Sequence, residues 1–402
     1  MSRPLIVTLN AGSSSLRCAV FERSEDGPRP RLRLSLRGLP DRMIWERQDA
    51  RNGETEDRDL DPPDTPSKAQ ATARAEILRR LLDEIAADDI AAVVHRVVHG
   101  GRNYVVPVMV DDAVLTDLEA LSPLAPSHQP HNLAAIRELS ERLADTPQIA
   151  CFDTAFHHTL PRNDRIFALP HALTEEGVHR YGFHGLSFEH VAATLAETAP
   201  DLARGRLVMA HLGHGVSMCA MQDGCSAATT MGMTALDGLP MGSRVGALDP
   251  GIVLYLIEER GMAPADLRQM LYERSGLQGM SGISGEMDEL LASDSEGAAR
   301  AVDFFVYRCQ REIGSLTAAL GGLDGLILTG GMGEHAPEIR RRICAGLGWL
   351  GVALDEDANR TGATRLSAPD ARVPVMMIPT DEETVLARHA EEVLSRGNAI
   401  TG

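Results

Sequence analysis

Two stretches of this 402-residue chain share one local pattern, and that repeat constrains the fold more than any other feature. VTLNAGSSSLRCAVF (residues 7–21) and MAHLGHGVSMCAMQ (residues 209–222) each show an apolar strand, a glycine- and serine-containing turn and a second apolar strand. Apolar runs that flank such a turn predict a hairpin. Because helical patterns and further apolar strands follow each hairpin, we expect an α/β fold with two related domains around a central cleft.

The composition supports two cores and limits the partners. A hydrophobic content of 44% over 402 residues is enough for two domains. The formal net charge of -18 argues against nucleic acid or an anionic membrane as a partner, although it does not exclude small anions. Lys68 is the sole lysine, so phosphate contacts must come from arginine, backbone N–H groups or a metal.

The cellular compartment follows from cysteine spacing and from the N-terminus. The six cysteines form no CxxC pair, which is typical of free thiols in a reducing cytosol. The chain opens without the apolar core of a signal peptide, and no apolar run reaches membrane-spanning length. We therefore expect a cytoplasmic protein.

Hydrophobic periodicity predicts the main elements. Strands are expected at residues 91–98, 148–152, 207–221 (with a turn) and 323–328. Helices are expected at residues 71–87, 112–121, 132–143, 250–260, 264–274 and 296–320. Residues 22–70 are polar and rich in proline, which favours irregular or edge strands.

The segment AAVVHRVVHGG (residues 91–101) raises a question about metal binding. His95 and His99 lie four residues apart, but a metal-binding pair at that spacing needs a helix, and the glutamate of HExxH is absent. On a strand, Arg96 and Val98 share one face. An arginine at the end of an interior strand needs an anionic partner. The residues leave two alternatives: a ligand anion whose apolar end touches Val98, or a structural salt bridge.

Other polar groups follow strands or glycine turns. The turns NAGSSS (10–15), GHGVS (213–217) and GGMGE (330–334) are suited to phosphate, because glycine lets an anion approach backbone N–H groups. Polar side chains placed at strand ends are those of Asp153, His184, Arg244 and Glu382. Such loops carry the sites of α/β folds. Taken singly, each charge also fits a solvated loop or a helix cap, as Glu382 does.

Eight motifs together resemble those of the acetate kinase family of acyl-phosphate-forming kinases. They are LNAGSSSLR, HRVVHGG, FDTAFH, RYGFHGLS, HLGHGVS, MGSRVGALDP, GGMGEHAPEIR and TDEE, and they extend from residue 4 to about residue 390. The resemblance implies the two-domain fold of actin, hexokinase and Hsp70, usually as a homodimer. It also implies transfer of a phosphoryl group from ATP to a small carboxylate, with Mg²⁺ or Mn²⁺.

The resemblance implies the domain limits and a role for each matching residue. The N-terminal domain would comprise residues 1–153 with the C-terminal helix 384–402, and residues 154–383 would bind the nucleotide. The catalytic residues would be Arg96, His128, Asp153, His184 and Arg244. The acid would contact Arg96, Val98, Ser127, Phe183 and Ala235. The nucleotide would contact Ser13, Ser15, Arg17, His211, Leu212, Gly213, His214, Gly215, Glu286, Met287, Asp288, Gly331, Met332, Gly333, Glu334 and His335. The metal would be held by Asn10 and Glu382.

These residue types suit the chemistry. A carboxylate with an ordinary pKa of about 4–5 is ionised at neutral pH, so it needs no general base. Catalysis must bring two anions together and stabilise charge on the phosphoryl group, for which arginines, a histidine and Mg²⁺ are suited. We expect Asp153 to orient an arginine or a metal-bound water rather than to remove a proton.

The chain departs from the family pattern at several positions. Ser127 replaces a leucine and Ala235 a proline at the acyl pocket, while His214 and His335 replace asparagines. Asp288 replaces an arginine in a segment that contacts the purine. Two alternatives to acetate kinase therefore stay open: a propionate or butyrate kinase, and a regulatory nucleotide-binding homologue with weak catalysis.

Overall fold

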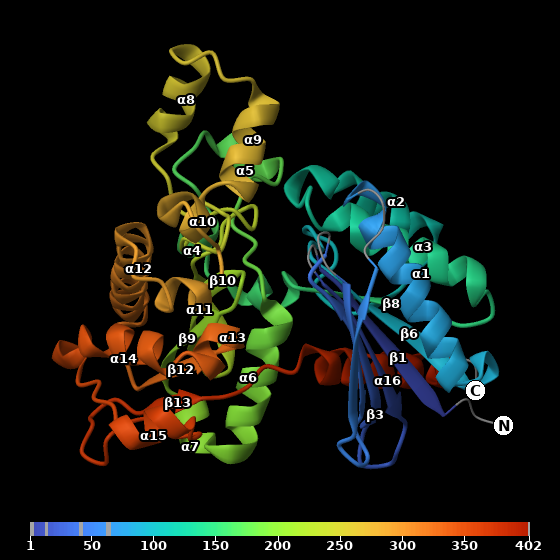
Figure 1. Cartoon of the computed structure of the whole chain (residues 1–402). Helices are drawn as coiled ribbons and strands as arrows, with labels where there is room; N and C mark the ends of the chain where they lie inside the picture. Colours follow the sequence, from blue (N-terminus) through green and yellow to red (C-terminus); the bar gives the residue numbers. More distant parts are fainter. Residues whose placement is uncertain (1–3, 13–14, 40–42, 62–65, 401–402) are drawn as a thin grey trace. The chain divides into compact units, whose positions relative to one another are not determined.

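The computed structural model describes residues 4–12, 15–39, 43–61 and 66–400 (Figure 1). The chain divides into two compact units. Unit 1 is formed by Met1–Ala155 together with Asp381–Gly402, and unit 2 by Phe156–Thr380. Each unit contains one β-sheet with helices, which confirms the expected α/β fold with two sheets.

The sheet of unit 1 has eight strands in the order β5-β4-β3-β2-β1-β6-β8-β7. Their bounds are β1 Leu5–Ala11, β2 Ser15–Glu22, β3 Arg29–Arg37, β4 Met43–Asp49, β5 Thr55–Leu60, β6 Ile90–Val97, β7 Val108–Met109 and β8 Gln148–Phe152. Strands β1 to β5 form an antiparallel meander, whereas β6 runs parallel to both β1 and β8. The carboxyl ends of β1, β6 and β8 therefore lie at one edge of this sheet.

Helices cover both faces of this sheet (Figure 1). They are α1 Pro66–Glu84, α2 Asp112–Ala120, α3 Gln129–Arg142 and α16 Glu382–Ile400, with 3-10 turns at Ala87–Asp89 and Ser122–Leu124. Leu5, Val7 and Leu9 of β1 enter a core with α1 and α3. Because successive side chains of a strand point to opposite faces, Asn10 lies on the other face, where α16 packs on β1 and β6.

The sheet of unit 2 has five strands in the order β11-β10-β9-β12-β13. Their bounds are β9 Arg206–Leu212, β10 Val216–Gln222, β11 Cys225–Thr229, β12 Gly325–Thr329 and β13 Val375–Met377. The strands β9, β10 and β11 are antiparallel, and β12 runs parallel to both β9 and β13. Order and direction thus repeat those of β3-β2-β1-β6-β8 in unit 1.

Helices also cover the sheet of unit 2, with α6 on one face and α12 on the other (Figure 1). The helices are α4 Arg162–Arg165, α5 His171–Glu175, α6 Gly185–Thr198, α7 Pro200–Ala203, α8 Pro250–Glu258, α9 Pro264–Glu273, α10 Gly276–Ser281, α11 Met287–Leu291, α12 Glu296–Leu320, α13 Gly330–His335, α14 Pro337–Ala345 and α15 Glu356–Thr361, with 3-10 turns at Ala155–Thr159 and Gly348–Leu350. Ser295 caps α12 by accepting a hydrogen bond from the backbone N–H of Ala298.

The structure differs most from the sequence expectation between residues 22 and 61. This part contains regular strands, and β3 and β4 lie inside the sheet. In β3, Leu32, Leu34 and Leu36 alternate with arginine and serine and enter the core of unit 1. Only β5 is an edge strand there, and its residues are largely exposed. Among the described helices we find none whose length and apolar content would carry the chain across a lipid bilayer.

Candidate active site

In unit 1, three parallel strands bring polar side chains to one edge of the sheet. Asn10 lies near the end of β1, Arg96 near the end of β6, and Asp153 directly after β8. The backbone N–H of Asp153 donates to the carbonyl of Val97 at 3.1 Å, which extends the β6–β8 pairing by one residue. Glu382 joins this edge as the first residue of α16. The side chain of Asp381 caps that helix by accepting from the N–H of Thr384 at 3.1 Å.

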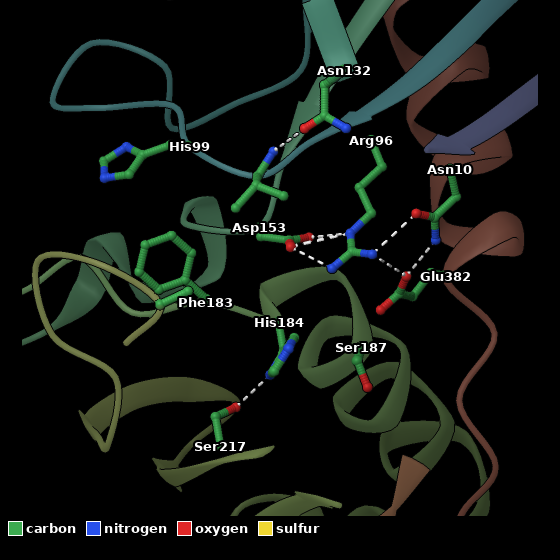
Figure 2. Close-up of polar contacts among 12 residues, drawn as sticks. Asn10, Arg96, His99, Asn132, Asp153, Phe183, His184, Ser187, Ser217 and Glu382 are labelled. Carbon is green, nitrogen blue, oxygen red and sulfur yellow. Dashed lines mark hydrogen bonds and ion pairs between the residues drawn. The ribbon is translucent and has the colours of Figure 1, made fainter. Parts of the chain in front are cut away.

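Arg96 is the centre of this cluster (Figure 2). Its Nε donates to Asp153 Oδ1 at 2.9 Å, and its Nη2 donates to Asp153 Oδ2 at 2.6 Å. Its Nη1 donates to Asn10 Oδ1 at 3.0 Å and lies 3.5 Å from Glu382 Oε2. Asn10 Nδ2 donates to the same Glu382 oxygen at 2.8 Å. The salt bridge that the sequence left open as one alternative for Arg96 is therefore present.

The charges of this cluster depend on one another. Burial by itself lowers the pKa of the Arg96 guanidinium, but Asp153 and Glu382 together act more strongly, so that its pKa is raised. Burial raises the pKa of the Asp153 carboxyl, and Arg96 opposes that shift. Asp153 is only 1% exposed. Such a carboxylate depends on the bidentate guanidinium for its compensation.

Two amide side chains of α3 fix the loop that follows Arg96. Asn132 Oδ1 accepts from the N–H of Val98 at 3.1 Å (Figure 2). Its Nδ2 donates to the carbonyl of Ala11 at 2.8 Å. Gln129 makes a pair of hydrogen bonds to the backbone of His99, at 3.1 and 3.0 Å. The end of β6 is thereby tied to the end of β1. Both amides are buried, so their hydrogen bonds are made in a low-dielectric environment.

The two histidines of β6 and its loop have structural partners. His95 Nε2 lies 2.8 Å from Gln148 Oε1, and burial lowers the pKa of His95 to about 4. His99 Nδ1 accepts from the N–H of Gly101 at 3.0 Å. Within the described part of the chain, no group of three or more histidine, cysteine or acidic side chains is arranged to hold a metal ion.

In unit 2, His184 adopts an unusual backbone conformation. It precedes α6 with φ 58° and ψ 26°, in the left-handed region that non-glycine residues rarely enter. Holding it there costs about 1–3 kcal/mol, a kind of strain that clusters at functional sites. Its Nδ1 lies 2.8 Å from the hydroxyl of Ser217 on β10 (Figure 2). The carbonyl of the preceding Phe183 accepts from His157 Nε2 at 3.0 Å.

A second imidazole stacks on the first. The ring centroids of His184 and His211 lie 4.4 Å apart, with an angle of 24° between the ring planes. His211 Nδ1 lies 2.8 Å from the hydroxyl of Ser187 on α6. The pairs are crossed. His184, which precedes α6, pairs with Ser217 of β10, and Ser217 lies opposite His211 in the β9–β10 pairing. His211 of β9 pairs with Ser187 of α6. This arrangement fixes both rings.

Gly215 brings His184 and Arg244 together. A Cβ atom at Gly215 would lie 2.9 Å from His184 Nε2 and 3.1 Å from Arg244 Nη2, so both side chains rest against this glycine. Arg244 Nη1 donates to the carbonyl of Ala235 at 2.8 Å. A larger residue at position 215 would displace one of these two side chains. The glycine of the turn thus serves side-chain placement as well as backbone exposure.

The second glycine turn of unit 2 adjoins the first. Gly330 has φ +78°, and a Cβ atom there would lie 3.0 Å from the backbone of Leu212. Glu334 Oε1 accepts from the N–H groups of Gly330 and Thr380, at 3.0 and 3.1 Å. Arg340 of α14 is 1% exposed and donates to the carbonyls of Gly333 and Glu334, at 3.0 and 2.8 Å. These contacts hold α13 against the end of β9.

Comparison with known proteins identifies the family of this chain. The family model described as the Acetokinase family matches residues 5–388. The chain belongs to the acetokinase family. The acetate kinase of Rhodopseudomonas palustris is 49% identical over 398 residues, which covers 98% of this chain and 99% of that protein. The acetate kinase of Rhizobium meliloti is 44% identical over 98% of this chain and 99% of that protein.

Solved structures agree with this assignment. The propionate kinase of Francisella tularensis is 30% identical and superposes with a TM-score of 0.86, covering 96% of this chain and 98% of that one. The acetate kinase of Porphyromonas gingivalis is 31% identical, with a TM-score of 0.81 over 97% of this chain and 100% of that one. The expectation of the acetokinase fold, which is the actin–hexokinase–Hsp70 type, is confirmed.

The acetokinase family generally uses a divalent metal, and the donor set of unit 1 fits one. Asn10 and Glu382 present an amide oxygen and a carboxylate side by side, linked by the 2.8 Å hydrogen bond. Magnesium in kinases is commonly held by one or two carboxylates, with water and substrate phosphates completing an octahedron. The finding of no all-protein metal cluster in the described residues is therefore compatible with such a site.

The residues assigned to the nucleotide differ in their surroundings. His214 Nδ1 lies 3.0 Å from Glu286 Oε1, and this contact lowers the pKa of the Glu286 carboxyl. Met287 is 4% exposed and belongs to the core of unit 2. Asp288 is exposed in the first turn of α11, where an acid is favourable to the helix dipole.

The remaining predicted site residues lie at turns and element ends. Ser15 begins β2 and Arg17 is exposed on it, whereas Ser13 lies outside the described residues. His128 precedes α3, next to the partly buried Ser127. Gly331 and His335 are exposed on α13, Met332 is partly buried, and Leu212, Gly333, Phe183 and Ala235 are buried. Gly213 lies between His211 and His214 in the first turn.

Sequence reasoning missed several polar residues that support the site. They are Gln129, Asn132, Ser187, Ser217, Arg340 and Thr380. Ser187, Ser217, Arg340 and Thr380 lie inside four of the eight motifs, so a signal was present. Their partners come from other parts of the chain, and a motif alone does not identify them.

Proposed function

We propose that this protein is a magnesium-dependent acetate kinase, which transfers the terminal phosphoryl group of ATP to acetate and forms acetyl phosphate and ADP. The observation that carries the proposal is the convergence of Asn10, Arg96, Asp153 and Glu382 at one sheet edge, in a chain of the acetokinase family. The reaction is reversible, because acetyl phosphate is itself an activated phosphate that can return its phosphoryl group to ADP.

Arg96 is proposed to bind the substrate carboxylate. Asp153 occupies Nε and one N–H of Nη2, so the second N–H of Nη2 points away from this carboxylate, as the fixed geometry of guanidinium requires. Val98 lies two residues further along and would contact the apolar end of the acid. Asp153 would act by orienting Arg96. The acetate oxygen is already ionised at neutral pH, so it attacks without proton removal.

The residues of unit 2 are proposed to handle the nucleotide and the phosphoryl group. The turns at Gly213–Gly215 and Gly330–Gly333 expose backbone N–H groups suited to phosphate. Arg244 and His184, which rest against Gly215, would stabilise charge on the transferring group. Such aligned donors act mainly on the transition state, because negative charge on the equatorial oxygens must be balanced there.

Asn10 and Glu382 would hold the metal ion, directly or through water. When bound, the ion neutralises charge on the phosphate oxygens of ATP. His128, Ser127, Phe183 and Ala235 are proposed as further contacts to the acid or the transferring group, on the strength of their motifs. The homodimer and the cytoplasmic location expected from the sequence remain predictions.

A trapping assay tests the proposal. Purified protein with Mg²⁺, ATP and acetate should convert hydroxylamine to acetyl hydroxamate, and omission of Mg²⁺ should abolish the product. The same assay with propionate, butyrate, GTP and pyrophosphate defines the acid and the donor. Folded protein that binds ATP but forms no hydroxamate with any acid or donor would contradict the proposal and favour the regulatory alternative.

A propionate kinase is the second candidate, and two observations favour it. Ser127 and Ala235 are smaller than the leucine and proline of the family pattern, which would enlarge the acyl pocket. The propionate kinase of Francisella tularensis is also among the solved structures most similar to this chain, with a TM-score of 0.86. The ratio of kcat/KM for the two acids decides between the candidates.

A further inference from the structure

A chain of hydrogen bonds in unit 2 ends on a ring nitrogen of His211. The hydroxyl of Thr380 donates to the hydroxyl oxygen of Ser187 at 2.9 Å. The Ser187 oxygen lies 2.8 Å from His211 Nδ1. Ser187 is fully buried and His211 is 9% exposed, so these contacts are shielded from water. Thr380 is itself fixed, because its backbone N–H donates to Glu334 Oε1 at 3.1 Å.

The direction of these bonds determines where the proton of the ring lies. A hydroxyl carries one hydrogen, so Ser187 accepts from Thr380 with a lone pair and retains its own hydrogen to donate. His211 Nδ1, 2.8 Å from the Ser187 oxygen, accepts that hydrogen. In a neutral imidazole one nitrogen accepts and the other carries the proton. Acceptance at Nδ1 therefore leaves the proton of His211 on Nε2.

The Nε2 atom of His211 lies at the first glycine turn of unit 2. A Cβ atom at Gly213 would be 3.1 Å from this nitrogen. The ring is held in that orientation by stacking on His184, with centroids 4.4 Å apart. A donor at Nε2 is thus presented at the turn whose backbone N–H groups are proposed to receive the phosphates of ATP.

We propose that Thr380 and Ser187 are positioning residues that hold His211 in its Nε2–H form, so that the ring donates a hydrogen bond to a phosphate of the nucleotide. The inference rests on the proposed function for the identity of the anion. The proton accounting itself uses only contacts within unit 2.

Thr380 is well placed to link two parts of the site. It is the last residue of unit 2, and Asp381 and Glu382 follow it in unit 1. Glu334 Oε1 joins its backbone to Gly330 of the second glycine turn. The same residue therefore connects the second turn, through Ser187, with the imidazole at the first turn. Loss of its hydroxyl should alter the ring without removing any group that contacts substrate.

Nitrogen NMR of the substrate-free protein tests the tautomer directly. Histidine labelled with ¹⁵N at both ring positions reports which nitrogen carries the proton, and the His211 signals are assigned by their loss in His211→Asn. We expect the Nε2–H form in the wild type and in Thr380→Ser. We expect a mixture of both forms in Thr380→Val and Ser187→Ala. Thr317→Val is the matched control, because its buried hydroxyl donates only within α12, to the carbonyl of Ile313 at 2.7 Å.

Kinetics test the role of that tautomer. Loss of one hydrogen bond to a charged phosphate is expected to raise the KM for ATP about tenfold in Thr380→Val and Ser187→Ala, with kcat changed less than about twofold. Thr380→Ser and Thr317→Val should resemble the wild type. A wild-type ring protonated on Nδ1, or a KM for ATP in Thr380→Val equal to that of Thr317→Val, overturns the inference. If no acyl phosphate is formed at all, the proposed function fails, while the tautomer is still read without substrate.

Discussion

The two units share one arrangement of five strands, here called the strand frame, but the polar side chains at the strand ends differ in kind. In unit 1, the ends of β1, β6 and β8 bear Asn10, Arg96 and Asp153, a buried cation enclosed by acids. In unit 2, the ends of β9 and β12 lead into glycine turns, and the imidazoles there are paired with neutral hydroxyls. Order and direction of the five corresponding strands are the same.

The difference shows how one strand arrangement can carry two kinds of polar environment. In unit 1 a full charge is balanced by full charges, so removal of one partner leaves another buried and uncompensated. In unit 2, Arg244 donates to the carbonyl of Ala235, and His184 and His211 lie within hydrogen-bond distance of serine hydroxyls. The strand frame determines where the side chains emerge, and the residues at strand ends determine how strongly the site is coupled to folding.

Arg96→Ala should have the largest effect on stability. It leaves the 1% exposed carboxylate of Asp153 without its guanidinium, which costs about 3–5 kcal/mol of the free energy of unfolding. Arg244 donates to a neutral carbonyl, that of Ala235, so Arg244→Ala leaves no acid uncompensated there and should cost about 1 kcal/mol. Urea denaturation monitored for the transition of each unit measures both. The double variant Arg96→Met/Asp153→Leu should regain stability, and equal losses in the two single variants would contradict the comparison.

Acidification should affect both units through buried histidines outside the site. His95 in unit 1 and His157 in unit 2 each have a pKa of about 4, lowered by burial from 6.5. Each is neutral when folded, whereas the unfolded chain binds a proton below pH 6.5. Their contribution is therefore complete above pH 6.5 and is lost as the pH falls towards 4, by about 3 kcal/mol each. Stability measured against pH tests this.

A variant separates the contribution of His95 from that of the other titrating groups. His95→Asn should reduce the slope of stability against pH between pH 6.5 and 5 by about 1.4 kcal/mol per unit. A slope identical to that of the wild type would mean that His95 is already protonated in the folded chain.

The acid preference should respond to Ser127 and Ala235. Each is smaller than the residue of the family pattern. A methylene in such a pocket is worth about 1–3 kcal/mol, so the wild type should use propionate at least as well as acetate. Ser127→Leu and Ala235→Pro should each shift kcat/KM towards acetate. A hundredfold acetate preference in the wild type would show that other side chains fill the space.

The smallest effect is expected at the exposed pair of the first glycine turn. His214 and Glu286 lie 3.0 Å apart, with side chains 47% and 58% exposed. Exposed pairs contribute about 0–1 kcal/mol, so Glu286→Gln should change the KM for ATP less than about fivefold. Steady-state kinetics at low and high salt measures this. A loss above a hundredfold would assign Glu286 a direct contact with the nucleotide.

Elements with clear boundaries could be predicted from the sequence. The strand Gln148–Phe152 was predicted to the residue because proline precedes it and Asp153 follows its apolar run. The hairpins were predicted because apolar runs flank glycine turns. Arg96 and Asp153 were placed at strand ends because the apolar runs stop there. The interior position of β3 and β4 was not predicted, because charged residues mask the alternation of Leu32, Leu34 and Leu36.

The pairing of side chains could not be predicted. Any of the 57 acidic residues was a candidate partner for Arg96, and only the β6–β8 register selects Asp153. The left-handed backbone of His184 depends on tertiary contacts rather than on its neighbours in sequence. The contact between Thr380 and Ser187 joins residues 193 positions apart. Long-range register of this kind leaves no local pattern.

The most direct test of the account compares the two arginines in one assay. With Mg²⁺, ATP and acetate, Arg96→Ala and Arg244→Ala should each lower kcat/KM by about 3–4 kcal/mol of transition-state stabilisation, or roughly a hundred- to a thousandfold. Arg206→Ala is the matched control, because Arg206 pairs with Asp324 on the surface of unit 2, at 2.8 Å. Its kcat/KM should stay near that of the wild type. Near-normal kcat/KM in folded Arg96→Ala or Arg244→Ala would contradict the assignment of that arginine as an anion-binding residue.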